Sequence, residues 1–143
     1  MENAGTVVLI VDDQISARKL LAQLVRAADA SLVPVECKDQ QEALEYLETH
    51  SVGLIIVDYR MPGSDGLTLV RYLRGMQSPT GEIPVIMVSA IESEDLRERT
   101  LRAGVTQFVP KRSTTDFTSF TRLIAETADR ERGDGGVSPA LAG

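Results

Sequence analysis

The chain has 143 residues, one cysteine and a formal net charge of -6 at pH 7. This length fits a single domain that can bury a sizeable core without a disulfide or a structural metal. Cys37 has no second cysteine to pair with, and no stretch resembles a signal peptide or a membrane span. The acidic balance disfavours direct binding to nucleic acid or to anionic membranes, so we expect a cytoplasmic domain with neither as a partner.

The first part of the chain alternates strand and helix signals. The apolar run 6–11 predicts a buried strand, and residues 17–28 place apolar side chains at the spacing of one helix face. The run Val33–Cys37 alternates apolar and polar residues and contains Pro34. Because proline cannot donate a hydrogen bond to a neighbouring strand, this run predicts an edge strand.

The same alternation continues through the middle of the chain. Asp39 followed by Glu42 has the pattern of a capping box and predicts the start of a second helix. The apolar run 52–57 predicts a third strand that ends at Asp58, and a loop then leads to Asp65, a candidate N-cap for a third helix.

Two further strand and helix units follow. The run 84–88 predicts a fourth strand, and the next helix has acidic residues at its start and Gly104 at its end. The run 107–109 predicts a fifth strand, and the last helix carries three apolar residues in step, namely Phe117, Phe120 and Ile124. Strands that alternate with helices predict an α/β fold with a doubly wound parallel sheet.

We expect three segments along the chain. Residues 1–5 form an N-terminal extension, 6–128 form the folded domain, and 129–143 form a flexible tail or a truncated linker. The last segment is rich in glycine and has few large apolar residues, so it buries too little surface to offset the entropy of ordering.

Polar residues stand at the ends of four of the predicted strands. Asp12 and Asp13 follow the first strand, Asp58 the third, Ser89 the fourth, and Lys111 follows the fifth after one proline. The carboxyl ends of parallel strands converge on one crevice, so these side chains are expected to share a pocket. Crowded carboxylates repel unless a proton or a cation intervenes, and a donor set of oxygens alone favours a hard ion such as Mg²⁺. The pattern predicts a site for magnesium and phosphate.

These strand-end motifs together resemble the receiver domain of two-component response regulators. The resemblance covers about residues 6 to 128 and is carried by motifs in the right order, namely Asp12-Asp13, Asp58–Gly66, Ser89-Ala90 and Phe108–Lys111. It implies a flavodoxin-like fold with a five-stranded parallel sheet in the order 2-1-3-4-5.

The resemblance also implies roles for the acidic residues. Asp58 matches the phosphoacceptor, whose carboxylate takes a phosphoryl group from a histidine of a partner kinase. Asp13, Asp58 and the backbone carbonyl of Arg60 match the ligands of Mg²⁺ (or Mn²⁺), and Asp12 matches a residue that helps to position the ion through water.

The remaining matched positions concern the phosphoryl group and the response to it. Lys111 is similar to the lysine that pairs with the bound phosphoryl group, and Ser89 to the hydroxyl that moves to hydrogen-bond it. Phe108 matches an aromatic switch position. Each of these residues alone is typical of a cap, a turn, a surface charge or ordinary core, and only their coincidence favours the functional interpretation.

The sequence departs from the family pattern after the fifth strand. The family lysine is usually followed by proline, whereas here Pro110 precedes Lys111 and Arg112 follows it. Because an ordinary peptide bond resists the cis form by roughly 2.5 to 4 kcal/mol, we expect a trans bond between Lys111 and Arg112. The long lysine stem is expected to reach the phosphoryl position all the same.

Three other functions compete with a phosphorylation-dependent switch. A haloacid-dehalogenase-type Mg²⁺-dependent phosphatase also uses a strand-end aspartate, but it requires two aspartates separated by one residue, and here Asp12 and Asp13 are adjacent. A flavin or dinucleotide module requires a glycine-rich loop after the first strand, where this chain is acidic. A phosphorylation-independent scaffold would lack a site residue, and none is missing.

The expected activity is that of a switch with at most weak self-catalysed phosphorylation and dephosphorylation, not that of an enzyme. The resemblance implies a histidine kinase or histidine phosphotransfer protein as partner, docking near Ile15 and Arg18. It places a downstream protein partner on the face of the fourth helix, fifth strand and last helix, and allows a phosphorylation-dependent homodimer. No effector module is recognisable after residue 128, so we expect either a stand-alone receiver that acts on a separate protein or one cut away from its effector domain.

Overall fold

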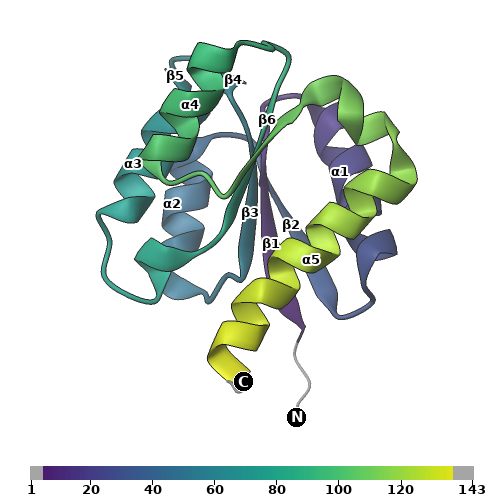
Figure 1. Cartoon of the computed structure of the whole chain (residues 1–143). Coiled ribbons are helices and arrows are strands. Elements are labelled where there is room, and N and C mark those ends of the chain that lie inside the picture. The colour runs from purple at the N-terminus through teal and green to yellow at the C-terminus, as the bar shows by residue number, and fades with distance from the viewer. Residues whose placement is uncertain (1–4, 137–143) are drawn as a thin grey trace.

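The computed structural model describes residues 5–136, and side chains as far as Asp129. Five parallel strands form one sheet in the order β2-β1-β3-β6-β7, which confirms the predicted topology (Figure 1). The strands are β1 (Thr6–Val11), β2 (Leu32–Cys37), β3 (Leu54–Asp58), β6 (Val85–Ser89) and β7 (Gln107–Pro110).

Helices cover both faces of the sheet. In Figure 1, α1 and α5 lie on one side and α2, α3 and α4 on the other. The helices are α1 (Ile15–Ala28), α2 (Gln40–Thr49), α3 (Gly66–Arg74), α4 (Glu94–Ala103) and α5 (Phe117–Gly136), with short 3-10 turns η1 (Thr80–Glu82) and η2 (Lys111–Thr115). Among the described residues no helix is both long and apolar enough to cross a membrane.

The central strands are buried on both faces, as their continuous apolar runs predict. In β3, Ile55 and Val57 pack into the core beneath α2 and α3, whereas Leu54 and Ile56 pack into the core beneath α1 and α5. This alternation follows from the two-residue period of a strand. The same alternation determines the side-chain direction of Asp58, the last residue of β3.

Helix ends follow the predicted caps. The Asp39 carboxylate accepts a hydrogen bond from the Glu42 N–H, and the Asp65 carboxylate accepts one from the Thr68 N–H. Gly104 closes α4 in a left-handed conformation with φ 113°, which a residue with a side chain adopts only under strain.

The edge strands also agree with the sequence. Pro34 lies in β2 and Pro110 ends β7, and these two strands form the edges of the sheet. A missing N–H is tolerated there because one side of the strand has no ladder partner.

Three local expectations differ from the structure. The loop expected before Asp65 contains a small antiparallel pair, β4 (Arg60–Met61) and β5 (Ser64–Asp65). Phe117, expected on the buried face of the last helix, is 57% exposed, because it is the first residue of α5 and the chain turns toward the core only afterwards. Helix α5 continues to Gly136, into the segment expected to be a tail, whereas residues 137–143 lie outside the described part of the chain.

Candidate functional site

The carboxyl edge of the sheet brings the predicted residues together. Asp58 is the last residue of β3, Asp12 follows β1 directly, and Lys111 follows β7. A hollow of about 430 Å³ opens at this edge. Its lining residues are Asp13, Gln14, Asp58, Arg60, Met61, Pro62, Ala90 and Lys111.

Three carboxylates crowd this hollow with one ammonium group. Asp12, Asp13 and Asp58 each place a carboxylate oxygen within 4.8 Å of the others. Asp12 and Asp58 are buried, at 1% and 7% exposure, and Asp13 is exposed. The Lys111 ammonium lies 3.9 Å from Asp12 Oδ2 and 3.7 Å from Asp58 Oδ1. The single nearby ammonium leaves the cluster with an excess of negative charge.

Burial and crowding appear together in the pKa values of the two buried aspartates. Burial first, and the neighbouring Asp12 carboxylate second, raise the pKa of Asp58 to about 6 against the lowering effect of Lys111. Burial also raises the pKa of Asp12, against the lowering effects of the Gln14 N–H and Lys111. A bound cation would reverse both shifts, because it stabilises the ionised carboxylates.

The loop after β1 is held by hydrogen bonds on several sides. The Gln14 N–H donates to Asp12 Oδ1 at 2.9 Å, and the Asp12 N–H donates to the Cys37 carbonyl at 3.1 Å. Arg18 donates from Nη1 to the Asp12 carbonyl at 2.7 Å and from Nε to Glu36 Oε1 at 3.2 Å. These contacts fix the Asp12 carboxylate at the sheet edge.

Arg18 therefore has a role that the sequence interpretation missed. Its side chain is only 14% exposed and is occupied by contacts within the domain, so it is not a free docking residue. Ile15, the other residue expected at the kinase interface, is 64% exposed. The only sequence signal for Arg18 is its position six residues after Asp12, in the first turns of α1.

Ser89, the last residue of β6, is not among the residues that line the acidic hollow, and its hydroxyl is turned to its own loop. The side chain is 1% exposed, donates to the Ile91 carbonyl at 3.1 Å and accepts from the Ile91 N–H at 2.9 Å. Phe108 does not line the acidic hollow. It is half-buried against the core and lines a separate hollow of about 280 Å³ beside Ser93 and Arg97 of the α4 region.

The departure after β7 has a clear structural outcome. The only cis peptide bond among the described residues is Ser78–Pro79, so the bond between Lys111 and Arg112 is trans, as expected. Lys111 still reaches the carboxylates. Arg112 makes a two-pronged contact with Glu92, from Nε at 2.8 Å and from Nη2 at 3.0 Å.

Gly66, the last residue of the Asp58–Gly66 motif, has a role beside the site that the sequence interpretation did not assign. Its N–H donates to the Tyr59 carbonyl at 2.7 Å, and a Cβ at this position would lie 2.7 Å from the Asp58 carbonyl oxygen. The backbone of α3 therefore approaches β3 too closely for any side chain. The Asp65-Gly66 pair was the available signal, since it joins a helix cap to a residue that permits close contact.

The residues present fit a divalent cation. Carboxylate and carbonyl oxygens are the ligands that Mg²⁺ prefers, and the cluster carries uncompensated negative charge. Asp13 and Asp58 would hold the ion with the carbonyl of Arg60, which lines the same hollow.

Comparison with known proteins gives a consistent family assignment. A family model described as the response regulator receiver domain matches residues 8–119. The chain is 38% identical over 107 residues to the cyclic di-GMP phosphodiesterase response regulator RpfG of Xanthomonas campestris pv. campestris (strain 8004), covering 75% of this chain and 28% of that protein. It is 29% identical over 104 residues to the phosphate regulon transcriptional regulatory protein PhoB of Escherichia coli (strain K12), covering 73% of this chain and 44% of that protein.

Solved structures agree with these relatives. The chemotaxis protein CheY4 of Vibrio cholerae superposes with a TM-score of 0.72 at 27% identity, covering 82% of this chain and 96% of that one. The chain thus spans almost the whole of this neighbour but less than half of the curated relatives named above.

Proposed function

Because the chain belongs to the response regulator receiver domain family, we propose that Asp58 accepts a phosphoryl group from a phosphohistidine of a histidine kinase or histidine phosphotransfer protein. The observation that carries this proposal is the position of Asp58. It ends the central strand, is almost fully buried, and faces one ammonium at 3.7 Å within a cluster of three carboxylates.

Each site residue has a separate role in the proposed reaction. The ionised Asp58 carboxylate attacks phosphorus, so an aspartyl O–P bond forms as the histidine N–P bond breaks and the imidazole leaves with that electron pair. Lys111 pairs with the phosphoryl oxygens in place of its present contacts with Asp12 and Asp58. Asp13, Asp58 and the Arg60 carbonyl would hold Mg²⁺ (or Mn²⁺), with Asp12 helping to position it, and the ion would supply charge neutralisation for the transferring oxygens.

The switch proceeds through Ser89. Its hydroxyl exchanges the Ile91 carbonyl for a phosphoryl oxygen, which releases the loop between β6 and α4. Phe108 packs beside this region, so its rotamer responds to the space that the loop vacates. The surface of α4, β7 and α5 then presents the phosphorylated state to a downstream protein, to an effector domain or to a second copy of the chain.

The chain acts as a switch in the cytoplasm and not as a metabolic enzyme. Receiver domains are phosphoacceptors, and the enzymatic or transcriptional activities named for relatives such as RpfG and PhoB belong to those longer proteins. The haloacid-dehalogenase and dinucleotide alternatives lose their support with the receiver match over residues 8–119. A phosphorylation-independent scaffold is the alternative that the following experiment addresses.

With Mg²⁺ and acetyl phosphate, the chain is expected to gain one acid-stable, base-labile phosphoryl group, detected by intact mass spectrometry. Asp58→Asn removes the nucleophile and is expected to abolish the gain, whereas Asp95→Asn makes the same charge change on exposed α4 and leaves it intact. Equal labelling of the wild type and Asp58→Asn would refute the assignment, and no labelling of the wild type would favour a scaffold.

A further inference from the structure

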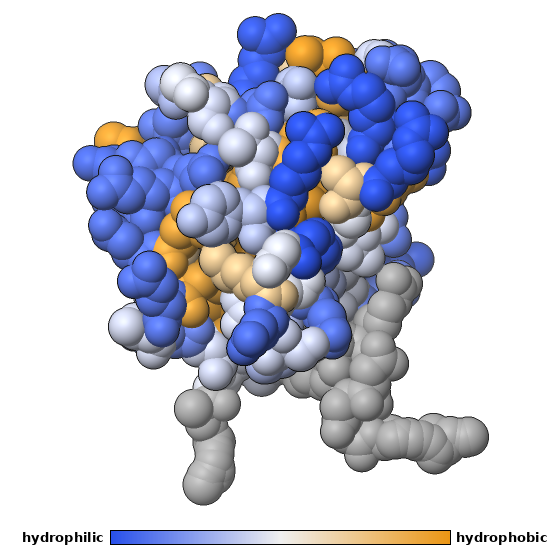
Figure 2. Space-filling model, turned by 90° about the vertical axis from the view of Figure 1, so that its left-hand side faces the viewer, coloured by the Kyte–Doolittle hydropathy of each residue, from blue (hydrophilic) through white to orange (hydrophobic). Residues whose placement is uncertain are grey.

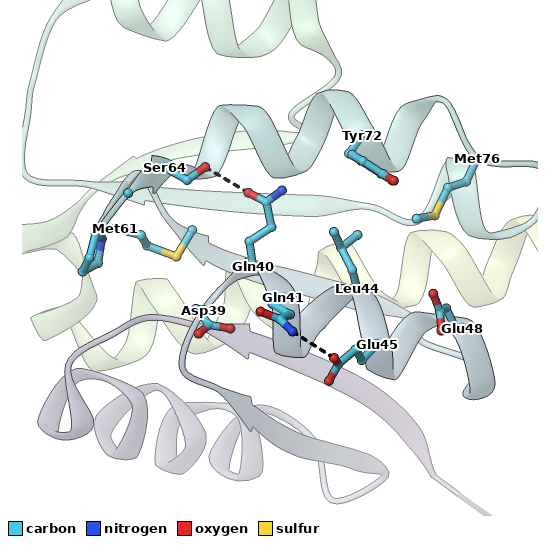
Figure 3. Close-up of a pocket in the computed structure, with 12 residues that line it drawn as sticks. Asp39, Gln40, Gln41, Leu44, Glu45, Glu48, Met61, Ser64, Tyr72 and Met76 are labelled. Carbon is cyan, nitrogen blue, oxygen red and sulfur yellow. Dashed lines mark hydrogen bonds between the residues drawn. The ribbon is translucent and has the colours of Figure 1, made fainter.

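A second hollow, larger than the acidic one, lies between α2 and α3. Its volume is about 640 Å³, and Figure 3 shows its residues along the two helices and the β4–β5 hairpin. The lining residues are Asp39, Gln40, Gln41, Leu44, Glu45, Glu48, Met61, Pro62, Gly63, Ser64, Tyr72 and Met76. We call this hollow the α2–α3 groove. The proposed phosphorylation chemistry does not use it.

The groove has an apolar interior. Leu44 of α2 and Tyr72 of α3 point toward each other across it, and Met76 lies at the far end (Figure 3). Tyr72 is 60% exposed, which is high for a large aromatic side chain in a well-packed domain. Figure 2 shows apolar surface on this side of the molecule, surrounded by hydrophilic surface. A hollow of about 640 Å³ with an apolar interior has the size and character of a binding groove.

The edge of the groove on the α2 side is acidic. Leu44, Glu45 and Glu48 are spaced as neighbours on one face of α2, and Asp39 caps the same helix. Both glutamates are exposed. No lysine or arginine is among the residues that line the groove, so their charge is not neutralised by another lining residue.

We propose that the α2–α3 groove docks a basic amphipathic helix of a partner protein. Helix α2 has 10 residues and provides a wall of about 15 Å, enough for roughly three turns of a helix laid beside it. Apolar side chains at helical spacing on the partner fill the interior, and its lysines or arginines meet the α2 carboxylates. This is helix-in-groove recognition with charge complementarity at the rim.

The acidic charge of the rim argues against three other occupants of the α2–α3 groove. A second copy of this chain carries a net charge of -6 at pH 7, so long-range repulsion opposes its approach to the acidic rim. An anionic lipid surface is repelled for the same reason. Residues 1–4 and 137–143 of this chain contain no lysine or arginine, so they cannot supply the complementary side chains.

The test uses a fluorescent, helix-forming peptide of roughly 18 residues with leucines along one face and arginines flanking them. Binding to the full chain is measured by anisotropy, without Mg²⁺ or phosphodonor, so the result does not depend on the chemistry of Asp58. We expect NMR shifts at the Leu44 and Met76 methyl groups. Glu45→Lys and Tyr72→Ala, both at exposed positions, are each expected to weaken binding about tenfold.

Glu98→Lys is the matched control, because it makes the same charge change on α4, outside the groove, and is expected to leave affinity within about twofold. A peptide with glutamate in place of arginine is expected not to bind. Equal weakening by Glu45→Lys and Glu98→Lys, or shifts centred on α4 and β7, would overturn the proposal. Absence of peptide binding to the chain would overturn it as well. Binding of the chain to phosphatidylserine vesicles but not to the peptide would also overturn it.

Discussion

At the scale of single residues, Asp58 is ionisable, buried and close to another buried carboxylate. Burial and Asp12 raise the pKa of Asp58 from 3.8 to about 6, and the ammonium of Lys111 does not offset them. A raised pKa means that the folded state binds this proton more tightly than the unfolded chain does. Stability then falls as pH rises from about 4 to about 6, where the folded chain must ionise Asp58 at a cost.

Asp58→Asn removes that cost, so without metal it is expected to be more stable than the wild type at pH 7 and to lose the advantage near pH 4. A pKa raised from 3.8 to about 6 corresponds to a difference in the free energy of unfolding on the order of 3 kcal/mol. Urea unfolding in EDTA between pH 4 and pH 7 measures the difference in unfolding free energy between Asp58→Asn and the wild type. Asp95→Asn is the control at an exposed position. A stability difference that does not change with pH would contradict the pKa assignment.

Asp13 differs from its neighbour because it is exposed, yet it contributes to the crowding around Asp58. Asp13→Asn removes one charge and one metal ligand, so we expect a melting temperature in EDTA that is about 2–4 °C above the wild type. The rise in melting temperature on adding Mg²⁺ is expected to shrink, because less metal binds the folded state. A lower metal-free melting temperature would instead make Asp13 a structural residue of the β1–α1 turn.

At the scale of elements, the loop from β6 to α4 is held at both ends. Ser89 bonds to Ile91 within the loop, and Arg112 of η2 bonds to Glu92 with two nitrogens. Arg112 stands where the family pattern has proline, so this ion pair accompanies the departure from that pattern. It lowers the pKa of Glu92. The loop that the Ser89 hydroxyl leaves in the proposed switch is thus tied to the segment that carries Lys111.

Arg112→Ala is expected to speed amide hydrogen exchange at residues 90–93 while leaving the global unfolding free energy unchanged, because the pair is exposed and closes only this loop. Arg99→Ala, which breaks the exposed Asp95 pair within α4, serves as the control. Unchanged exchange in the loop after Arg112→Ala would show that Ser89 and Ile91 hold it without help.

The elements themselves could be predicted well from the sequence, because apolar runs and caps are local signals. Asp39, Asp65 and Gly104 end or begin their helices as expected. The β4–β5 hairpin could not be predicted, since its strands have two residues each and are too short to show alternation. The exposure of Phe117 depends on how the chain leaves η2, which periodicity does not encode.

The candidate site also contains residues that the sequence predicts and residues that it does not. Asp12, Asp13, Asp58 and Lys111 could be placed in one pocket because each follows a strand, and parallel strands share an edge. The support around them could not be placed, because Arg18 and Gly66 act through three-dimensional contacts with backbone carbonyls. The hydroxyl direction of Ser89 is likewise a property of the loop that follows it.

At the scale of the whole molecule, the proposed phosphoryl site and the expected output surface lie on different parts of the same sheet. A beryllofluoride mimic on Asp58 is expected to shift amide resonances across residues 90–110, because Ser89 and Phe108 stand on the adjoining strands β6 and β7. The same addition to Asp58→Asn is the control. Shifts confined to residues that line the acidic hollow would contradict a conformational switch.

Met61 and Pro62 form part of the lining of both the acidic hollow and the α2–α3 groove. A helix seated in the groove and a cation beside the Arg60 carbonyl would therefore both act on one short hairpin. Thermodynamic reciprocity then applies: whatever factor the cation imposes on the affinity for the helix, the helix imposes on the affinity for the cation. A partner helix that changes the affinity for the cation through this hairpin would thereby change the readiness of Asp58 for phosphorylation without touching it.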